Sequence, residues 1–398
     1  MKIDKKIIPL AIGGLGIGTT EFTIMGLLPD VARTLQISIP EAGHLISAYA
    51  FGVVVGAPLL IGYSVKFPPK KVLMALMVIF TFFNALSAIA PDYTTMMVIR
   101  FLSGLPHGAF FGVGTVVAAR MAAKGKEAFN ISLMFTGLTV ANLAMVPLVT
   151  YIGHTFHWRW YFAIVSVIGL LALLFIKWWL PVLKSNEETH FMEEIKFLKK
   201  RQAWLVLMIT AIGFGGLFTW FSYITPLMTL VSGIKESYMA YVMILAGAGM
   251  VVGNLVGGYL SDRLSPEKTC SLLLFLMMFS LAGVFFFSEY RVASLALTFI
   301  CGALSMSVAA PINIMMMKAA PKSEMMAAAF MQAAFNIANA MGAFLGGIPL
   351  EKGYSYNYPS LVGVVMTIIG LVISIRYKYL YASKTKDDAV AECVTCDQ

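Results

Sequence analysis

Long apolar stretches alternate with short polar ones along almost the whole chain. Each apolar stretch is about 20 residues long, which is enough for a helix to cross a hydrocarbon core of roughly 30 Å. The first is expected to be a retained span rather than a removed signal peptide, because its apolar run continues to about Leu28 without a small-residue cleavage site. The pattern predicts twelve membrane-spanning helices, at approximately 7–28, 42–63, 72–90, 94–118, 129–152, 160–180, 204–230, 238–260, 269–288, 293–316, 326–349 and 358–377.

Composition agrees with a chain that lies in a membrane. Hydrophobic residues make up 59% and charged residues 12% of the 398 residues, whereas about a quarter of an ordinary soluble domain is charged. A net charge of +9 would suggest nucleic acid as a partner of a soluble protein. Here the basic residues fall in short loops between apolar stretches, so we expect a lipid bilayer and no nucleic acid.

The distribution of lysine and arginine predicts the orientation of the chain. If the N-terminus is cytoplasmic, 23 of the 29 basic residues lie on that side and six on the other. Cytoplasmic loops of membrane proteins carry such an excess. We therefore predict a multi-pass protein of the bacterial inner (plasma) membrane with both termini in the cytoplasm.

The longest polar connection, from about Pro181 to Gln202, divides the spans into two sets of six. Apolar residues recur every three or four positions within it, which favours an amphipathic helix on the membrane surface over a loosely ordered hinge loop. The CxxC of Cys393 and Cys396 is a weak metal or redox signal, and we expect a disordered tail there. The predicted domains are a bundle at 1–181, a cytoplasmic linker at 182–202, a second bundle at 203–383 and a cytoplasmic tail at 384–398.

The two halves repeat each other at a constant offset of 197 residues. The matched pairs are Gly52 with Gly249, Gly56 with Gly253, Lys66 with Arg263, Pro69 with Pro266 and Lys71 with Lys268. The repeat predicts two pseudo-symmetric bundles related by an axis along the membrane normal, an arrangement in which transporters place the substrate site between the halves. A channel or a membrane enzyme could also be duplicated, so the repeat supports transport without establishing it.

Four segments resemble motifs of a known family. They are Gly258–Lys268 after the eighth span, Arg100–Gly108 in the fourth, Thr20–Asp30 in the first and His157–Phe162 before the sixth. These segments resemble the major facilitator superfamily, and the whole chain is similar to its twelve-span drug:H⁺ antiporter group, specifically the AraJ-type subgroup of sugar or drug exporters. The resemblance implies an all-α integral membrane protein with twelve transmembrane helices in two pseudo-symmetric six-helix bundles.

The resemblance also implies residues that gate access to the substrate. Gly258, Asp262 and Arg263 match the signature loop of the family, and Lys66 has the corresponding position in the first half. Val65 stands where the family has a gating aspartate, and the antiporter motif of the fifth span is eroded. We therefore expect the better-preserved gate in the second half and proton handling in the first.

Three ionisable residues within predicted spans are candidates for proton coupling. An acid near the centre of a membrane helix costs about 2.5–3.5 kcal/mol on insertion scales and usually faces a cavity or a partner. Glu21 is therefore the first candidate, and an acid satisfied by neighbouring threonines near an interface is the alternative. Arg100 could tune an acid or hold an anion, or it could snorkel to the membrane surface. His107, about two turns further on, could relay protons or make structural hydrogen bonds.

Polar and aromatic residues within the spans are candidates for a substrate cavity. Gln332, Asn336 and Asn339 recur at helical spacing and can share one stripe of a helix. Trp220 could stack on a sugar or an aromatic drug, although packing is the alternative for every residue of this kind. The predicted cavity set is Tyr49, Asn142, Trp220, Tyr223, Asn313, Gln332 and Asn336.

The predicted function is secondary active transport: proton-coupled efflux of a small organic solute, sugar or drug-like, by alternating access. Ser103 and His107 lie four residues apart, as a nucleophile and base could, but no HExxH, Walker or dinucleotide motif is present. We therefore predict no enzyme, no metal and no cofactor, and a monomer whose partners are a small molecule and protons. Uptake, a signalling role and an intramembrane enzyme are the alternatives, and the sequence leaves the substrate, direction and proton stoichiometry open.

Overall fold

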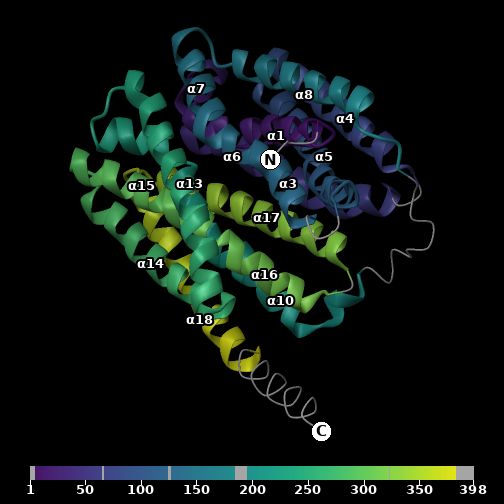
Figure 1. Cartoon of the computed structure of the whole chain (residues 1–398). Coiled ribbons are helices and arrows are strands. Elements are labelled where there is room, and N and C mark those ends of the chain that lie inside the picture. Colours follow the sequence, from purple (N-terminus) through teal and green to yellow (C-terminus); the bar gives the residue numbers. More distant parts are fainter. Residues whose placement is uncertain (1–4, 65–66, 124–126, 184–194, 322, 382–398) are drawn as a thin grey trace.

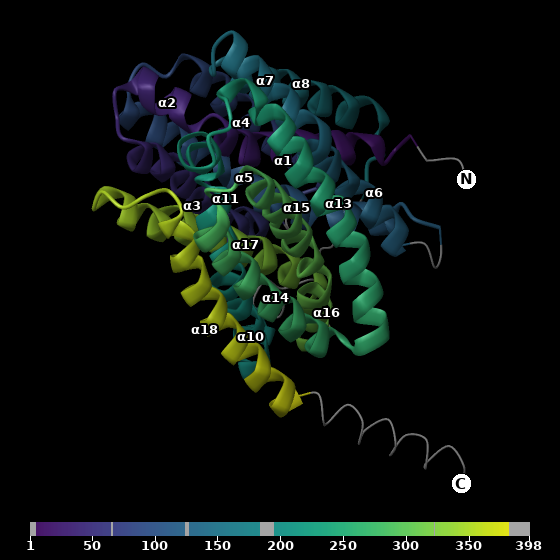
Figure 2. The ribbon, with the colours of Figure 1, turned by 90° about the vertical axis from the view of Figure 1, so that its left-hand side faces the viewer.

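The computed structural model describes residues 5–64, 67–123, 127–183, 195–321 and 323–381. This part of the chain is helical, without a strand, and contains twelve segments long and apolar enough to cross a membrane. Figures 1 and 2 show the purple-to-blue half and the green-to-yellow half of the chain as two bundles. The predicted all-α fold with twelve spans is confirmed.

Each bundle contributes six of these spans. The first contains α1 (Ile8–Gly26), α2 (Leu28–Leu35), α3 (Ile39–Ser64), α4 (Pro69–Ile89), α5 (Tyr93–Arg120), α6 (Glu127–Val140), η1 (Ala141–Met145), α7 (Val146–Thr155) and α8 (Trp160–Trp179). The second contains α10 (Arg201–Met208), η3 (Ile209–Phe214), α11 (Gly215–Phe221), α12 (Ile224–Pro226), η4 (Leu227–Val231), η5 (Glu236–Tyr238), α13 (Met239–Leu264), α14 (Pro266–Phe287), α15 (Arg291–Ser307), α16 (Ala309–Ala319), α17 (Glu324–Glu351) and α18 (Tyr358–Tyr381).

The predicted linker helix lies largely outside the described residues. Its described end is a short 3₁₀ helix, η2 (Lys196–Lys199). Cys393 and Cys396 of the tail and Lys66 of the predicted first-half gate also lie outside the described residues.

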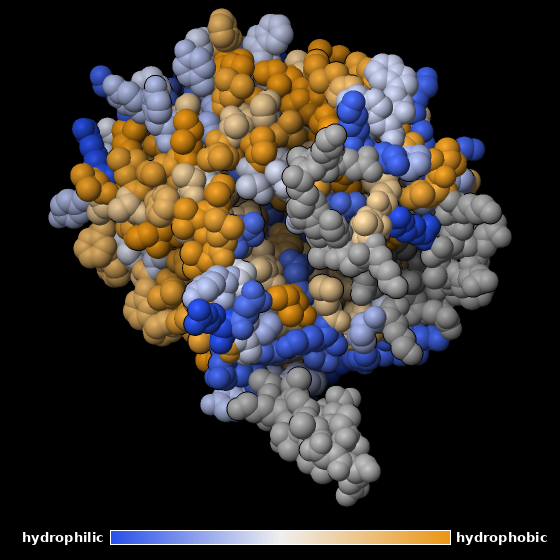
Figure 3. All heavy atoms as spheres, in the orientation of Figure 1, coloured by the Kyte–Doolittle hydropathy of each residue, from blue (hydrophilic) through white to orange (hydrophobic). Residues whose placement is uncertain are grey.

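Many large apolar side chains point outward from the bundles. Leu59 of α3, Leu255 of α13 and Phe286 of α14 are 65%, 71% and 66% exposed. In Figure 3 hydrophobic residues cover much of the visible face, and hydrophilic residues gather along its lower edge, near the ends of α13 and α16. Lipid tails are as apolar as leucine, so a surface of this kind suits a bilayer.

Matched glycines build the same helix contact in both bundles. A Cβ atom on Gly52 would overlap the carbonyl oxygen of Phe101, and one on Gly249 would overlap that of Phe299. The pairs α3 with α5 and α13 with α15 therefore approach until their backbones touch, as small residues allow in membrane proteins. The glycines repeated in the sequence thus make the same close contact between two helix backbones in each bundle.

Replacing Gly253 by alanine is expected to destabilise the protein. Its Cβ would overlap the backbone carbonyl of Ala303, which cannot rotate away, and overpacking of this kind costs about 1–3 kcal/mol or more. Gly258→Ala in the same helix is the matched control, because its Cβ would meet no atom within 4 Å. Thermal unfolding in detergent should show a lower midpoint for Gly253→Ala only; equal midpoints would contradict this account of the packing.

Prolines explain two interruptions that the sequence analysis did not predict. The fifth span was expected to be one helix, but it contains the π-helix η1 just before Pro147, whose missing N–H frees the carbonyl of Leu143. The tenth span is divided at Val308, where Pro311 frees the carbonyl of Ser307. π-bulges often mark functional sites, and η1 carries a predicted cavity residue, Asn142.

Candidate functional site

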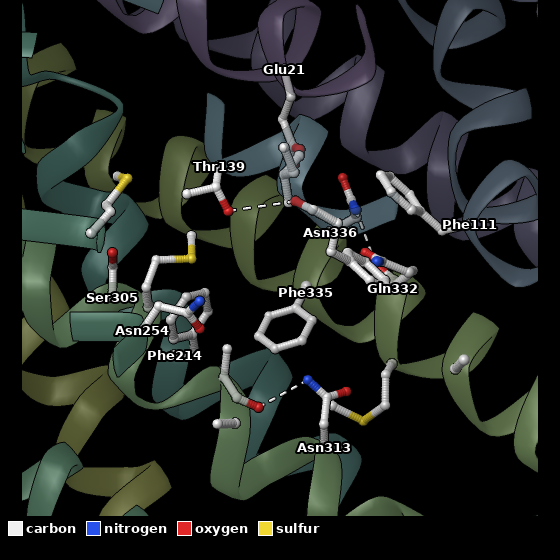
Figure 4. A pocket seen from close by; sticks show the side chains of 18 of the residues that line it. Glu21, Phe111, Thr139, Phe214, Asn254, Ser305, Asn313, Gln332, Phe335 and Asn336 are labelled. Atoms are coloured by element: carbon white, nitrogen blue, oxygen red, sulfur yellow. Dashed lines mark hydrogen bonds between the residues drawn. The ribbon is translucent and has the colours of Figure 1, made fainter. Parts of the chain in front are cut away.

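A cavity of about 450 Å³ lies between the two bundles. Two of its lining residues, Thr115 and Met317, lie near the ends of α5 and α16, on the side of the protein where α1 begins and α18 ends. We call this side the termini face. Glu21 and Phe22 of α1 line the cavity far from that face. Figure 3 shows a hollow near the centre of the visible face, and Figure 4 shows the cavity from close by.

The lining of the cavity is mostly apolar. Seven phenylalanines and five methionines contribute to it: Phe22, Phe111, Phe135, Phe214, Phe218, Phe221, Phe335, Met250, Met306, Met316, Met317 and Met331. Its main polar groups are the amides of Asn142, Asn254, Asn313, Gln332 and Asn336. A cavity of this size and lining suits a small organic molecule.

Glu21 is the one ionisable residue that lines this cavity in the described part of the chain. Its side chain is nearly buried, with 7% of the residue exposed. Its Oε1 lies 3.4 Å from Nδ2 of Asn339, which donates to it from α17 of the second bundle. The neighbouring threonines do not satisfy it: Thr19 donates to a carbonyl of its own helix, and Thr20 donates to Asn84. Glu21 therefore faces a cavity and connects the two bundles.

Arg100 is completely buried, so it does not snorkel to the membrane surface. Its guanidinium donates to Oγ1 and the carbonyl oxygen of Thr20, at 3.3 and 3.5 Å, and lies 4.3 Å from the centre of the Tyr49 ring. Tyr161 also donates to the Thr20 carbonyl. No ion pair joins Arg100 to Glu21 among the residues that the structure describes. Arg100 thus places a fixed positive charge against the residue that precedes Glu21.

His107 lies in the same network but not in the cavity. It is buried, and its Nδ1 lies 3.2 Å from the hydroxyl of Tyr49. Tyr49 consequently contacts both His107 and Arg100. Ser103 donates to the carbonyl of Arg100 at 2.8 Å and is not bonded to His107, so these two residues do not form a nucleophile–base pair.

The structure divides the predicted cavity residues into two groups. The four amides line the cavity: Asn142, Asn313, Gln332 and Asn336. The three aromatic residues are buried between helices and do not line it: Tyr49, Trp220 and Tyr223. In the seventh span the cavity instead receives Phe214, Phe218 and Phe221.

Some polar residues that line the cavity were not predicted from the sequence, and Asn254 and Ser305 are the two of them labelled in Figure 4. Asn254 lies inside a predicted span and directly follows the repeat glycine Gly253. The criterion that identified the other asparagines, a polar group within an apolar span, would also have found Asn254. Ser305 is weaker evidence of this kind, since a serine can satisfy itself on its own helix, as Ser305 does with the carbonyl of Gly302.

The predicted gating residues of the second half lie at the end of α13 on the termini face. Asp262 and Arg263 are exposed, and the Arg263 guanidinium lies 5.1 Å from the centre of the Tyr259 ring. A side chain added at Gly258 would meet open space. Within the described ranges neither Asp262 nor Arg263 forms an ion pair with the first bundle. Their role in gating stays a prediction.

On the side opposite the termini face, which we call the closed face, a side chain of the second bundle satisfies a carbonyl of the first. Pro29 has no N–H, so the carbonyl of Met25 cannot receive its usual helical bond, and α1 ends at Gly26. Oγ1 of Thr225 lies 3.0 Å from the carbonyl oxygens of both Met25 and Gly26 and donates to them. The break in the first span is thereby fixed to the seventh span.

Tyr223 occupies a slot between two glycines at the closed face. Its hydroxyl donates to the carbonyl of Ala343 at 2.7 Å. A Cβ atom on Gly43 of α3 would lie 2.5 Å from this hydroxyl, and one on Gly347 of α17 would lie 2.7 Å from it. Nearby, Ser47 of α3 donates to α17 at 3.0 Å. The contact between α3 and α17 thus closes the protein on this face.

Two membrane-spanning bundles around a cavity that contains one acid and opens on one face define a membrane transporter. The model of the Major Facilitator Superfamily matches residues 10–328, and the chain belongs to this superfamily. The AraJ protein of Escherichia coli (strain K12) is 37% identical over 386 residues, which are 96% of this chain and 98% of AraJ. The inner membrane transport protein YdhP of the same strain is 38% identical over 373 residues, 94% and 96% of the two chains.

A solved structure shows the same fold. It is that of a bacterial homologue of the human lysosomal transporter Spinster in an inward-facing and unoccupied conformation. Its TM-score is 0.75 at 12% identity, and the match covers 95% of this chain and 97% of that one. Together with the twelve spans, the relatives make this chain a multi-pass inner-membrane transporter and not an enzyme.

Proposed function

We propose that this transporter couples proton entry to the export of a small, largely apolar organic solute, and that Glu21 binds the proton. One observation carries the proposal: Glu21 is the sole ionisable lining residue of the cavity in the described part of the chain, and it lies far from the cavity entrance. The excess of lysine and arginine supports a cytoplasmic termini face. In this conformation the cavity would then open toward the cytoplasm.

Protonation of Glu21 would change both the charge of the cavity and a contact between the bundles. Binding of a proton removes one negative charge from the lining. It also changes the bond from Asn339, which joins α1 to α17. In transporters built from two repeats, the halves rock around the site between them. A group that titrates at this boundary can therefore favour one facing state over the other, as a difference in interaction energy between the states requires.

We assign Arg100 and His107 supporting roles in proton coupling. Arg100 supplies a buried positive charge that Thr20 and Tyr49 hold in place. His107 lies within hydrogen-bond distance of the Tyr49 hydroxyl and helps to orient it. Neither residue lines the cavity, so the solute would meet only Glu21 among the three candidates.

The lining favours a drug-like solute over a sugar. Burial of a hydroxyl group without a hydrogen bond is costly, and a sugar would bring several hydroxyl groups among seven phenylalanines and five methionines. Methionine adapts its shape to different contacts, so several related apolar solutes should bind. The resemblance to drug exporters supports export over uptake.

A substrate panel in everted membrane vesicles tests this function. In vesicles acidified by respiration, aromatic amines and other lipophilic solutes should collapse the imposed pH gradient within seconds to minutes, because each transported solute returns protons. Pentoses should leave the gradient unchanged. Vesicles without the protein are the control. Collapse by pentoses alone would instead identify a sugar exporter, and collapse by no solute would count against proton coupling.

A further inference from the structure

Two ion pairs join the bundles at the closed face. Nη2 of Arg33 in α2 lies 3.6 Å from Oε1 of Glu236 in η5. Nε2 of His44, near the start of α3, lies 3.8 Å from Oε1 of Glu351, at the end of α17. In both pairs the basic residue belongs to the first bundle and the acid to the second. Each pair must therefore separate when the bundles move apart on this face.

His44 lies where α3 and α17 meet, directly after Gly43 of the slot around Tyr223. Its ring packs against that of Phe344 in α17, with centroids 5.7 Å apart. Its Nδ1 lies 3.2 Å from the hydroxyl of Tyr93, at the start of α5. The two ring nitrogens thus face two different partners, and only a protonated imidazole can donate to both of them.

The bundles that carry the charges around His44 decide which of them change with the facing state. The charged or titratable groups on its own helix and on the helices that pack against it here are Glu41 of α3, Tyr93 of α5, Asp30 and Arg33 of α2, and Glu351 and Lys352 of α17. The groups of α2, α3 and α5 belong to the same bundle as His44, so they stay with it when the halves rock. Those of α17 move away from it, and Glu351 is the one in contact.

The other histidines of the closed face have their partners within the first bundle. Nδ1 of His154 in α7 lies 2.8 Å from Oδ2 of Asp30 in α2. Nδ1 of His157 accepts a bond from the backbone N–H of Arg159. Neither contact has to change when the two bundles move relative to each other. In the described part of the chain, His44 is therefore the histidine of this face that reaches the second bundle.

We propose that the His44–Glu351 pair is a proton-sensitive contact that holds the closed face shut when His44 is protonated and releases it when His44 is neutral. A histidine side chain changes its charge between about pH 5 and pH 8. The charged ring has its acidic partner only when the face is closed, so the closed state binds the proton more tightly. By linkage, protons then favour the closed state. The stabilisation is present at low pH and is lost as the pH rises through the histidine range.

This contact would respond to the solution outside the cell. The inference rests on the proposed function for one point, that the termini face is cytoplasmic and the closed face external. External acid would then close this face after the solute has left and return the cavity to the cytoplasm. The side chains of His44 and Glu351 are 26% and 51% exposed. Water therefore screens the pair, and exposed pairs shift an equilibrium by about two- to five-fold.

Distances between spin labels across the closed face measure the two facing states. Thr94→Cys at the start of α5 and Ser355→Cys after α17 place one label at an exposed position on each bundle, with Cys393 and Cys396 replaced by serine. Double electron–electron resonance on the purified full-length protein in nanodiscs, without solute, gives the ratio of the closed to the open state. Glu21→Gln in every sample removes the titration of the cavity acid.

Between about pH 5.5 and about pH 8.5 the ratio of the closed to the open state should fall about three-fold. His44→Gln and Glu351→Gln should each remove this dependence and keep the ratio near its value at high pH. Arg33→Gln is the matched control, because it breaks the other pair between the bundles, in which arginine keeps its charge. It should lower the ratio by a similar factor at both pH values and preserve the three-fold dependence.

Two results would overturn the proposal. One is a ratio that does not change with pH, and the other is a pH dependence that survives both His44→Gln and Glu351→Gln. If only the closed state is populated, Tyr223→Phe in every sample removes one hydrogen bond at this face and makes the ratio measurable. Solute, proton gradient and Glu21 are all absent from this experiment. The expected pH dependence in a protein that fails the vesicle assay would therefore support the His44–Glu351 contact and reject proton-coupled export.

Discussion

Glu21→Gln is expected to abolish the collapse of a pH gradient by the transported solute. Glutamine has nearly the shape of glutamate and can still accept a hydrogen bond from Asn339, but it cannot bind and release a proton. The cavity then loses the only lining group that titrates in the described part of the chain. In everted vesicles, the rate of gradient collapse should fall to that of vesicles without the protein.

A second measurement separates proton coupling from folding. Addition of solute to the purified protein in a weakly buffered solution should release protons from the wild type and none from Glu21→Gln. Glu289→Gln is the matched control, because Glu289 is exposed in the loop between α14 and α15; it should behave as the wild type does. Normal gradient collapse by Glu21→Gln would remove Glu21 from the coupling mechanism. A lower unfolding midpoint for Glu21→Gln would point to a structural role of Glu21 instead.

The architecture could be predicted because membranes impose simple rules. A helix must satisfy its backbone internally in lipid, so span length and apolar composition alone gave twelve spans. The offset between Gly56 and Gly253 predicted a repeat, and both glycines turned out to lie against a facing backbone. The breaks in the spans could not be predicted as easily. Pro58 and Pro106 lie inside continuous helices, whereas Pro147 follows a π-helix, so a proline alone does not decide whether a span breaks.

Polar residues of the site could be predicted from the sequence, because a polar group within a membrane span is energetically costly. Its aromatic residues could not. Glu21 and the asparagines stand out because polar groups in a membrane need a partner or a cavity. Aromatic residues carry no such cost in an apolar span, so the sequence could not tell whether Trp220 or Phe221 faces the cavity. The bond from Asn339 to Glu21 was also beyond prediction. It joins residues 318 positions apart, from two bundles, and depends on how the bundles sit against each other.

A substitution in the slot around Tyr223 is expected to disfavour the conformation in which the closed face is closed. Gly43→Ala places a methyl group 2.5 Å from the Tyr223 hydroxyl. The hydroxyl is held by its hydrogen bond to the carbonyl of Ala343, so a shift that relieves the overlap would weaken that bond. Overpacking costs about 1–3 kcal/mol. This cost arises only in the conformation in which α3 and α17 are in contact. The equilibrium between the two facing states would therefore shift away from this conformation by roughly 5- to 150-fold.

Labelling of a cysteine in the cavity would measure this shift. With Cys393 and Cys396 replaced by serine, Thr139→Cys should react with a membrane-impermeant maleimide in everted vesicles. Gly43→Ala should slow this reaction in proportion to the lost population of this conformation, by at most the factor of the equilibrium shift. Tyr223→Phe in addition to Gly43→Ala should raise the rate to that of Tyr223→Phe alone, because removal of the hydroxyl makes room for the methyl group. Tyr223→Phe alone loses one hydrogen bond, worth about 0.5–1.5 kcal/mol, and should slow labelling less than Gly43→Ala. If Gly43→Ala slows labelling and Tyr223→Phe gives no rescue, the tyrosine slot is not what closes this face.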